Sequence, residues 1–115
     1  MTGLAPVRLG RSGLWVSPVC LGTMTFGATT STGEAARIAD AALDRGVFFW
    51  DTADMYGKGR SEQIVGGLMG SRRGRVVLAT KAWAQMGPGP NDGGLSARHL
   101  IAACEASLSL SLIHI

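Results

Sequence analysis

Hydrophobic and polar residues alternate over residues 7–16, on either side of the polar turn 10–13. This period of two around a glycine-containing turn predicts a β-hairpin. Three later blocks, 19–21, 47–50 and 76–79, are apolar without alternation. Such blocks are typical of short strands that are buried on both faces.

Helical spacing of apolar residues follows each block. The expected N-caps of the three helices are Ser31, Ser61 and Ser96. Ser31 and Glu34 have the spacing of a capping box, in which each side chain bonds the other residue's backbone N–H. Gly46 is placed to end the first helix. Strands that alternate with helices indicate parallel βαβ units, so the predicted fold class is α/β.

Two architectures of this class are a doubly wound sheet and a (β/α)₈ barrel. A dinucleotide-binding start would carry GxGxxG after its first strand, and residues 22–27 do not supply it. Residues 57–61 also lack the GxxxxGK[ST] pattern of a phosphate-binding loop. The sequence therefore favours the N-terminal part of a (β/α)₈ TIM barrel, a β-hairpin followed by about three βα units.

Composition limits the cellular locations and the kinds of binding partner that the sequence allows. The chain has 115 residues, 46% of them apolar and 17% charged, with a net charge of +3. No apolar run approaches the roughly 20 residues of a membrane span, and the N-terminus does not resemble a signal peptide, so we expect a cytoplasmic protein without a membrane partner. Residues 72–75 are basic but carry no interleaved aromatics, which indicates a solvated loop and no nucleic-acid partner.

The two cysteines, Cys20 and Cys104, are far apart and belong to no CxxC pattern. With no histidine beside them, they are interpreted as buried free thiols, and no metal site is expected. His99, at the start of the third helix, is interpreted as a surface or capping residue.

Candidate chemistry lies where the predicted strands end. Asp51 follows the second strand of the parallel set, Tyr56 lies in the loop beyond it, and Lys81 follows the third strand. Active sites of barrels gather at the carboxyl ends of strands, so Asp51 and Lys81 could form an ion pair with Tyr56 above them. An ammonium close to a phenol favours proton release. Spacing alone leaves other interpretations open: a solvated lysine, an aspartate that caps a turn and a tyrosine that only packs.

Several motifs in order resemble the signature of the aldo-keto reductases. The strongest are the following segments: Gly46-Val-Phe-Phe-Trp-Asp51-Thr-Ala-Asp-Met-Tyr56-Gly57, Gly59-Arg-Ser-Glu62 and Val77-Leu-Ala-Thr-Lys81. Residues 9–14, 20–27 and 94–108 are similar to that family too, so the resemblance spans residues 7–109.

The resemblance implies a barrel that reduces small aldehydes or ketones with NADPH and is closed at the bottom by the hairpin. It assigns Tyr56 as the proton donor, Lys81 as the residue that promotes its ionisation and Asp51 as the partner of the lysine. Asp51 would also lie near the nicotinamide ribose. Phe48 departs from the asparagine common at its position, which affects local packing.

The same resemblance places the turn after the first parallel strand beside the cofactor; the residues are Gly22, Thr23 and Met24. The alternative that it leaves open is a barrel like the channel-associated β subunits, in which the fold binds cofactor as a regulatory module.

The end of the chain leads to a separate hypothesis. A complete barrel needs about 250 residues, so residues 1–109 are interpreted as the N-terminal portion of one, and this chain alone is expected to be inactive. Residues 110–115 read Leu-Ser-Leu-Ile-His-Ile, which is the translation of a transposase-end sequence used in sequencing-library preparation. We interpret them as a non-native adapter-derived tail, and for that reason His114 is not assigned as a catalytic histidine.

Overall fold

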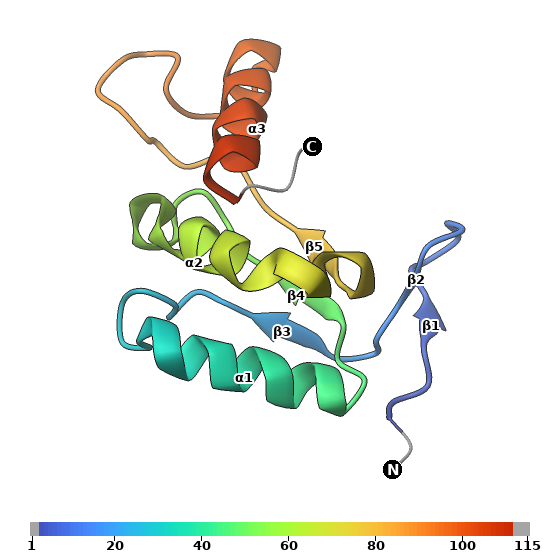
Figure 1. The fold of residues 1–115 in the computed structure, drawn as a ribbon. Helices are drawn as coiled ribbons and strands as arrows, with labels where there is room; N and C mark the ends of the chain where they lie inside the picture. The colour runs from blue at the N-terminus through green and yellow to red at the C-terminus, as the bar shows by residue number, and fades with distance from the viewer. Residues whose placement is uncertain (1–2, 112–115) are drawn as a thin grey trace.

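The computed structural model describes residues 3–111 and contains two small sheets (Figure 1). The first is the antiparallel hairpin of β1 (Val7–Arg8) and β2 (Trp15–Val16). The second is parallel, in the order β3 (Cys20–Gly22), β4 (Phe49–Asp51), β5 (Val77–Ala79). The predicted hairpin and the predicted parallel strands are therefore both confirmed.

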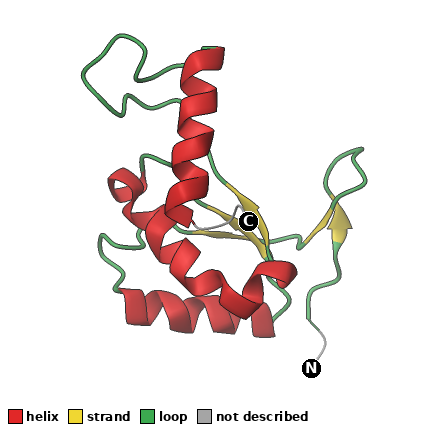
Figure 2. Cartoon of the chain, turned by 45° about the horizontal axis from the view of Figure 1, so that its top comes forward, coloured by secondary structure: helices red, strands yellow, loops and turns green. Residues whose placement is uncertain are grey.

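Helical segments alternate with the parallel strands. In chain order they are α1 (Thr32–Asp44), the 3₁₀ turn η1 (Tyr56–Gly59), α2 (Arg60–Met69), the 3₁₀ turn η2 (Gly70–Arg75) and α3 (Ala97–Ser111). Figures 1 and 2 show α1 and α2 side by side on one face of the parallel sheet, with α3 standing against α2. This is the strand–helix order expected of successive βα units. Among the described residues, no helix has the length and apolarity that a membrane crossing requires.

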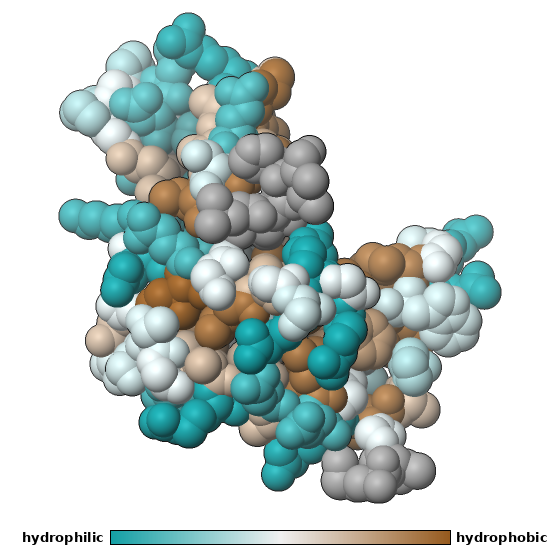
Figure 3. All heavy atoms as spheres, in the orientation of Figure 1, coloured by the Kyte–Doolittle hydropathy of each residue, from teal (hydrophilic) through white to brown (hydrophobic). Residues whose placement is uncertain are grey.

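The core lies between these two helices and the sheet. Trp50, at the centre of β4, is completely buried, and its Nε1 donates to the carbonyl of Val47 at 2.9 Å. Ala35 and Ala39 of α1 are fully buried against it, as is Val65 of α2. Figure 3 shows apolar atoms in the seam between α1 and α2, with hydrophilic atoms over most of the surrounding surface.

The predicted strand 47–50 begins later than expected, at Phe49, because the backbone N–H of Val47 bonds back to the last turn of α1. The N–H of Val47 donates to the carbonyl of Ala42 at 2.9 Å, and Gly46 takes a positive φ of 79° just after the helix. The apolar block therefore supplies both a hydrogen bond that closes the end of α1 and the strand β4. Gly46 ends the first helix as predicted.

Two of the three predicted N-caps are confirmed. The Ser31 hydroxyl accepts from Glu34 N at 3.2 Å, although the Glu34 carboxylate pairs with Arg37 rather than reaching back to complete a capping box. The Ser96 hydroxyl accepts from His99 N at 3.1 Å. The prediction for Ser61 was wrong, because α2 begins two residues earlier than expected and its N-cap is Gly59, with φ 96°.

The hairpin joins the sheet at the end opposite Asp51. The buried hydroxyl of Ser17, just after β2, accepts from Phe48 N at 3.2 Å and from Phe49 N at 3.0 Å. These bonds fix the start of β4 and leave its carboxyl end free for chemistry.

The basic segment 72–75 is part of η2 rather than a solvated loop. The Arg72 guanidinium forms an ion pair with Asp40 at 2.8 Å, and Arg73 donates to the carbonyl of Val76 at 3.0 Å. Both side chains therefore help to hold η2 against its neighbours.

Substitution of Gly46 tests how tightly the N-terminal segment packs at the end of α1, and Gly67 in α2 serves as the control. A Cβ at Gly46 would lie 2.8 Å from Leu4 N, whereas a Cβ at Gly67, inside α2, would meet nothing within 4 Å. We expect Gly46→Ala to lower the free energy of unfolding by about 1–2 kcal/mol because of its positive φ and this contact. Gly67→Ala should raise it by up to about 1 kcal/mol. Urea unfolding followed by circular dichroism measures both; a Gly46→Ala protein as stable as the parent would contradict the observed packing.

Candidate active site

The three parallel strands end at the same level. Gly22, Asp51 and Ala79 are in register across β3, β4 and β5. Beyond β5 the chain stays close to this edge, because Asp54 N donates to the carbonyl of Lys81 at 3.2 Å. The carboxyl end of the sheet therefore brings together the turn after β3, the turn after β4 and Lys81.

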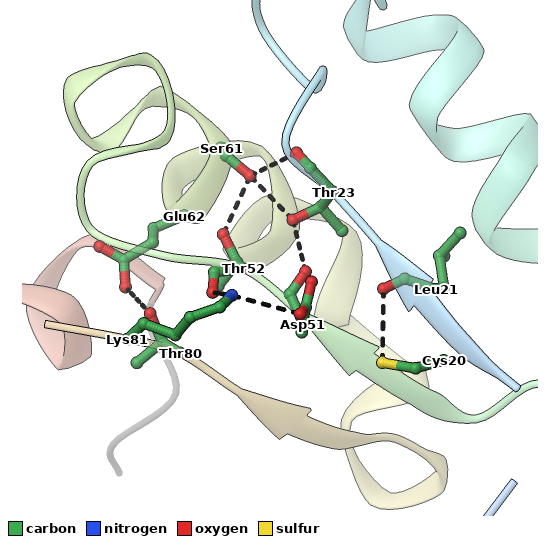
Figure 4. A network of polar contacts seen from close by, with 9 residues as sticks. All are labelled: Cys20, Leu21, Thr23, Asp51, Thr52, Ser61, Glu62, Thr80 and Lys81. Carbon is green, nitrogen blue, oxygen red and sulfur yellow. Dashed lines mark hydrogen bonds and ion pairs between the residues drawn. The ribbon is translucent and has the colours of Figure 1, made fainter. Parts of the chain in front are cut away.

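Lys81 joins two of the residues assigned from the sequence. Its Nζ lies 3.2 Å from Asp51 Oδ2 and donates to the carbonyl of Thr52 at 2.7 Å (Figure 4). The same Nζ lies 4.8 Å from the centre of the Tyr56 ring. The ion pair expected between Asp51 and Lys81 is present, and Tyr56 curls back over it as anticipated.

The charge on Lys81 is stabilised by these neighbours. Partial burial acts to lower the pKa of Lys81, but the hydrogen bond with Tyr56 and the hydrogen bond and charge of Asp51 outweigh it, so the pKa is raised above 10.5. The ammonium therefore persists through the neutral range. Its interaction with Asp51 stabilises the fold below the ordinary lysine value and is lost as the pH rises through the raised one.

Beneath this exposed pair lies a buried network of hydroxyl groups (Figure 4). Thr23 Oγ1 donates to the carbonyl of Asp51 at 2.7 Å, and Ser61 Oγ donates to the carbonyl of Thr23 at 2.8 Å. Because each hydroxyl has one proton, the 2.9 Å contact between Thr52 Oγ1 and Ser61 Oγ has Thr52 as its donor. The bonds thus run in one direction, Thr52 to Ser61 to Thr23 to Asp51.

This network explains why Ser61 is inside α2 rather than at its cap. The helix presents the hydroxyl to the turn after β3 and the end of β4, and the left-handed Gly59 takes the capping position. Sequence spacing identified Ser61 as important for α2 but gave no sign of these long-range partners.

The residues assigned to cofactor binding lie beside Asp51. A Cβ at Gly22 would stand 3.7 Å from Asp51 Oδ1, so glycine leaves this flank of the carboxylate open, and Met24 is 63% exposed. Thr23 is fully buried, and its hydroxyl is used in the network. The turn after β3 therefore borders Asp51, with Thr23 holding it in place, and the role of these three residues in cofactor binding stays a prediction.

His99 contradicts its sequence-based interpretation as a surface residue. Only 5% of it is exposed, because the Ser96 cap orients the first turn of α3 so that position 99 faces a cavity shared with Glu62 of α2. A single histidine at a helix start carries no sequence signal for this burial, which depends on how α3 packs.

The comparisons with known proteins agree with this geometry. The Aldo/keto reductase family matches residues 18–110. The chain belongs to the aldo/keto reductase family. It is 46% identical over 112 residues to the uncharacterized oxidoreductase YrpG of Bacillus subtilis (strain 168), covering 87% of this chain and 34% of that protein. It is 44% identical over 106 residues to a probable voltage-gated potassium channel subunit beta of Arabidopsis thaliana, covering 88% and 32%.

Solved structures of the family share the arrangement. The holo form of an aldo-keto reductase from Bacillus halodurans has a TM-score of 0.78 and 33% identity, over 95% of this chain and 37% of that one. A putative aldo-keto reductase from Pseudomona aeruginosa has a TM-score of 0.80 and 35% identity, over 93% and 41%. The chain spans about a third of the length of the curated relatives that it matches. The described fold is a partial barrel, as predicted.

Removing the Ser61 hydroxyl tests the buried network. Ser61→Ala leaves the carbonyl of Thr23 and the hydroxyl of Thr52 without this partner, so we expect the free energy of unfolding to fall by about 1–3 kcal/mol. The matched control is Ser71→Ala at an exposed position, which should change stability by less than about 0.5 kcal/mol. Urea unfolding compares the two variants, and equal effects would show that the network does not stabilise the fold.

Cys20 offers a chemical probe of the same charges. Both cysteines are free as predicted, but they are exposed rather than buried. Partial desolvation and the negative charge of Asp51 raise the pKa of Cys20 above 9.0, and Lys81 opposes them. The Cys20 thiol should therefore be largely protonated at pH 8 and react slowly there. Its reaction should become faster as the pH rises past the ordinary pKa of a cysteine.

Alkylation by iodoacetamide at pH 8, in a Cys104→Ser background, measures this directly. Asp51→Asn should speed the reaction of Cys20 and Lys81→Met should slow it, each by about two- to fivefold. Circular dichroism verifies that both variants fold. Changes of the same sign in the two variants would contradict the charge arrangement.

Proposed function

We propose that the whole protein is an oxidoreductase that reduces small aldehydes or ketones with a nicotinamide cofactor. The observation that carries the proposal is Lys81, whose ammonium pairs with Asp51 and lies over the ring of Tyr56. NADPH is preferred over NADH only because the family resemblance favours it. A cytoplasmic location remains part of the same proposal.

In the proposed mechanism, Tyr56 transfers the proton, and Lys81 and Asp51 support that transfer. A bound nicotinamide would supply a hydride to the carbonyl carbon. As the C=O π electrons move to the oxygen, Tyr56 Oη gives that oxygen its proton. The Lys81 ammonium stabilises the phenolate that remains, and the Asp51 carboxylate keeps the ammonium charged and oriented.

The surroundings of this group suit an apolar substrate. Large apolar side chains are more than half exposed in each loop that follows a parallel strand; they are Met24, Met55 and Trp83. In the whole protein such side chains would contact the organic part of a carbonyl compound and exclude water from the Tyr56 hydroxyl.

The division of the chain at residue 109 also remains a proposal. The family match ends at residue 110, which supports a native N-terminal portion up to about that point. Helix α3 continues to Ser111, and residues 112–115, His114 among them, lie outside the described residues.

A second candidate function is a cofactor-binding regulatory subunit without turnover. The 44% identity to a probable channel subunit beta favours keeping it. The two candidates differ in a measurable way, since a regulatory subunit would bind NADPH tightly and turn it over very slowly.

Tyr56→Phe tests the enzymatic proposal in a chain that carries the remaining barrel. Loss of the proton donor should lower kcat for carbonyl-dependent NADPH oxidation by about 10²–10⁴-fold. Cofactor affinity, measured by quenching of protein fluorescence, should change by less than about twofold, because the aromatic ring remains and only the hydroxyl is lost. The exposed substitution Ser71→Ala, in η2 and outside the proposed site, is the control for turnover. Unchanged kcat in Tyr56→Phe would overturn the mechanism, and absent turnover with tight NADPH binding in the parent would favour the regulatory subunit.

A further inference from the structure

A cavity of about 390 Å³ lies behind the Tyr56 turn, away from the Lys81 group. Its walls come from segment 54–59, from α2, from the loop 86–92 and from one face of α3. Its volume is in the range of small-molecule binding sites. Neither Asp51 nor Lys81 lines it.

Glu62 presents a buried carboxylate oxygen to this cavity. The residue is completely inaccessible, and its Oε2 accepts from Thr80 Oγ1 at 2.8 Å. Its Oε1 has no hydrogen-bond partner among the residues that the structure describes, and Figure 4 shows this oxygen pointing away from Thr80. A buried carboxylate oxygen without a donor is strongly unfavourable, so its presence needs an explanation.

His99 supplies a second group of the same kind. It lines the same cavity, is 5% exposed, and its Nε2 also has no partner within residues 3–111. Two buried polar atoms without partners on one cavity indicate that the missing partner is a ligand with hydrogen-bonding groups.

The charge of the walls selects the kind of ligand. The carboxylates of Asp54, Glu62 and Asp92 line the cavity together with the single ammonium of Lys58. Three negative groups against one positive group favour a cation. A metal ion is not supported, because the described residues contain no group of three or more His, Cys, Asp or Glu side chains arranged to hold one.

The opposite wall is apolar. It is formed by small side chains along one face of α3; they are Ala102, Ala103 and Ala106. A short hydrocarbon chain could lie against them while its head group reached Glu62 and His99.

We propose that this cavity binds a small alkylammonium compound. Its N–H groups donate to Glu62 Oε1 and His99 Nε2, and its aliphatic chain packs against α3. This site is separate from the proposed carbonyl chemistry. It shares Lys58 and Gly59 with the turn that carries Tyr56, so the bound amine would buttress that turn from behind.

The test is a titration of the 115-residue chain with n-butylamine. Thermal denaturation at constant ionic strength and pH should show a saturable increase in Tm. Two probes of nearly the same shape, 1-butanol and butyrate, should give no comparable shift, because one lacks the charge and the other reverses it. Equal stabilisation by all three, or none by butylamine, overturns the proposal.

Variants identify the site. Glu62→Gln keeps the shape and an oxygen for Thr80 but removes the charge, so we expect butylamine to bind at least about tenfold more weakly. Glu34→Gln, at an exposed position of α1, is the matched control and should bind like the parent. If both variants bind equally well, the amine lies elsewhere and the proposal fails.

A second measurement does not depend on the stability of the variants. The imidazole resonances of His99 in the parent chain, assigned with a His99→Gln sample, should shift on addition of butylamine with the same saturation as Tm. Unmoved His99 resonances at saturation would overturn the proposed contact.

The same titration should be repeated with a chain that carries the remaining barrel, because the rest of the protein could itself occupy this cavity. Binding of butylamine by the longer chain is the expected result. Loss of binding there means that the protein itself fills the cavity, and the proposal is wrong.

Discussion

The in-register pairing of three short parallel strands determines where every other feature of this chain lies. Because Gly22, Asp51 and Ala79 are at one level, the turns that follow them converge on one edge of the sheet. A shift of one residue would turn Asp51 to the opposite face and bury its carboxylate against the helices. The ion pair with Lys81 is possible only in the observed register. The core around Trp50 fixes that register, because this side chain must point toward α1 and α2.

Charged and neutral polar groups have separate tasks at this edge. The polar groups that contact the start of α2 are hydroxyls and backbone carbonyls. Among them, Ser61 bonds to Thr23, 38 residues away in sequence. Hydroxyls can be buried at small cost once they are bonded. The charged pair lies above them, with the Lys81 side chain half exposed and the Asp51 side chain one-third exposed. The network thus provides rigidity, and the charges remain available to a substrate.

The sequence predicted the features that depend on neighbouring residues. The hairpin around residues 10–13, the Ser31 and Ser96 caps and the end of α1 at Gly46 follow from local chemistry, and each is observed. The family motifs pointed to Asp51, Tyr56 and Lys81, which lie close together in the structure, and their catalytic roles stay a prediction. The role of Ser61 and the burial of His99 could not be predicted, because both depend on contacts between α2, α3 and distant turns. Cys20 and Cys104 are exposed for the same reason: their type favours burial, and the packing of this chain does not provide it.

The two polar regions on either side of the Tyr56 turn differ in how well their groups are satisfied. In the candidate active site, Lys81 has two acceptors and a ring within reach, although it is half exposed and could bond water instead. Behind the turn, Glu62 and His99 are shielded from solvent, and each has an atom with no partner in the described structure. The charged groups of the first region are already paired, whereas Glu62 and His99 each keep a buried atom without a partner in the described structure. A site with buried, unsatisfied polar atoms has more to gain from a specific ligand than one whose groups are already paired, and for this reason the proposed amine is assigned to the cavity behind the turn.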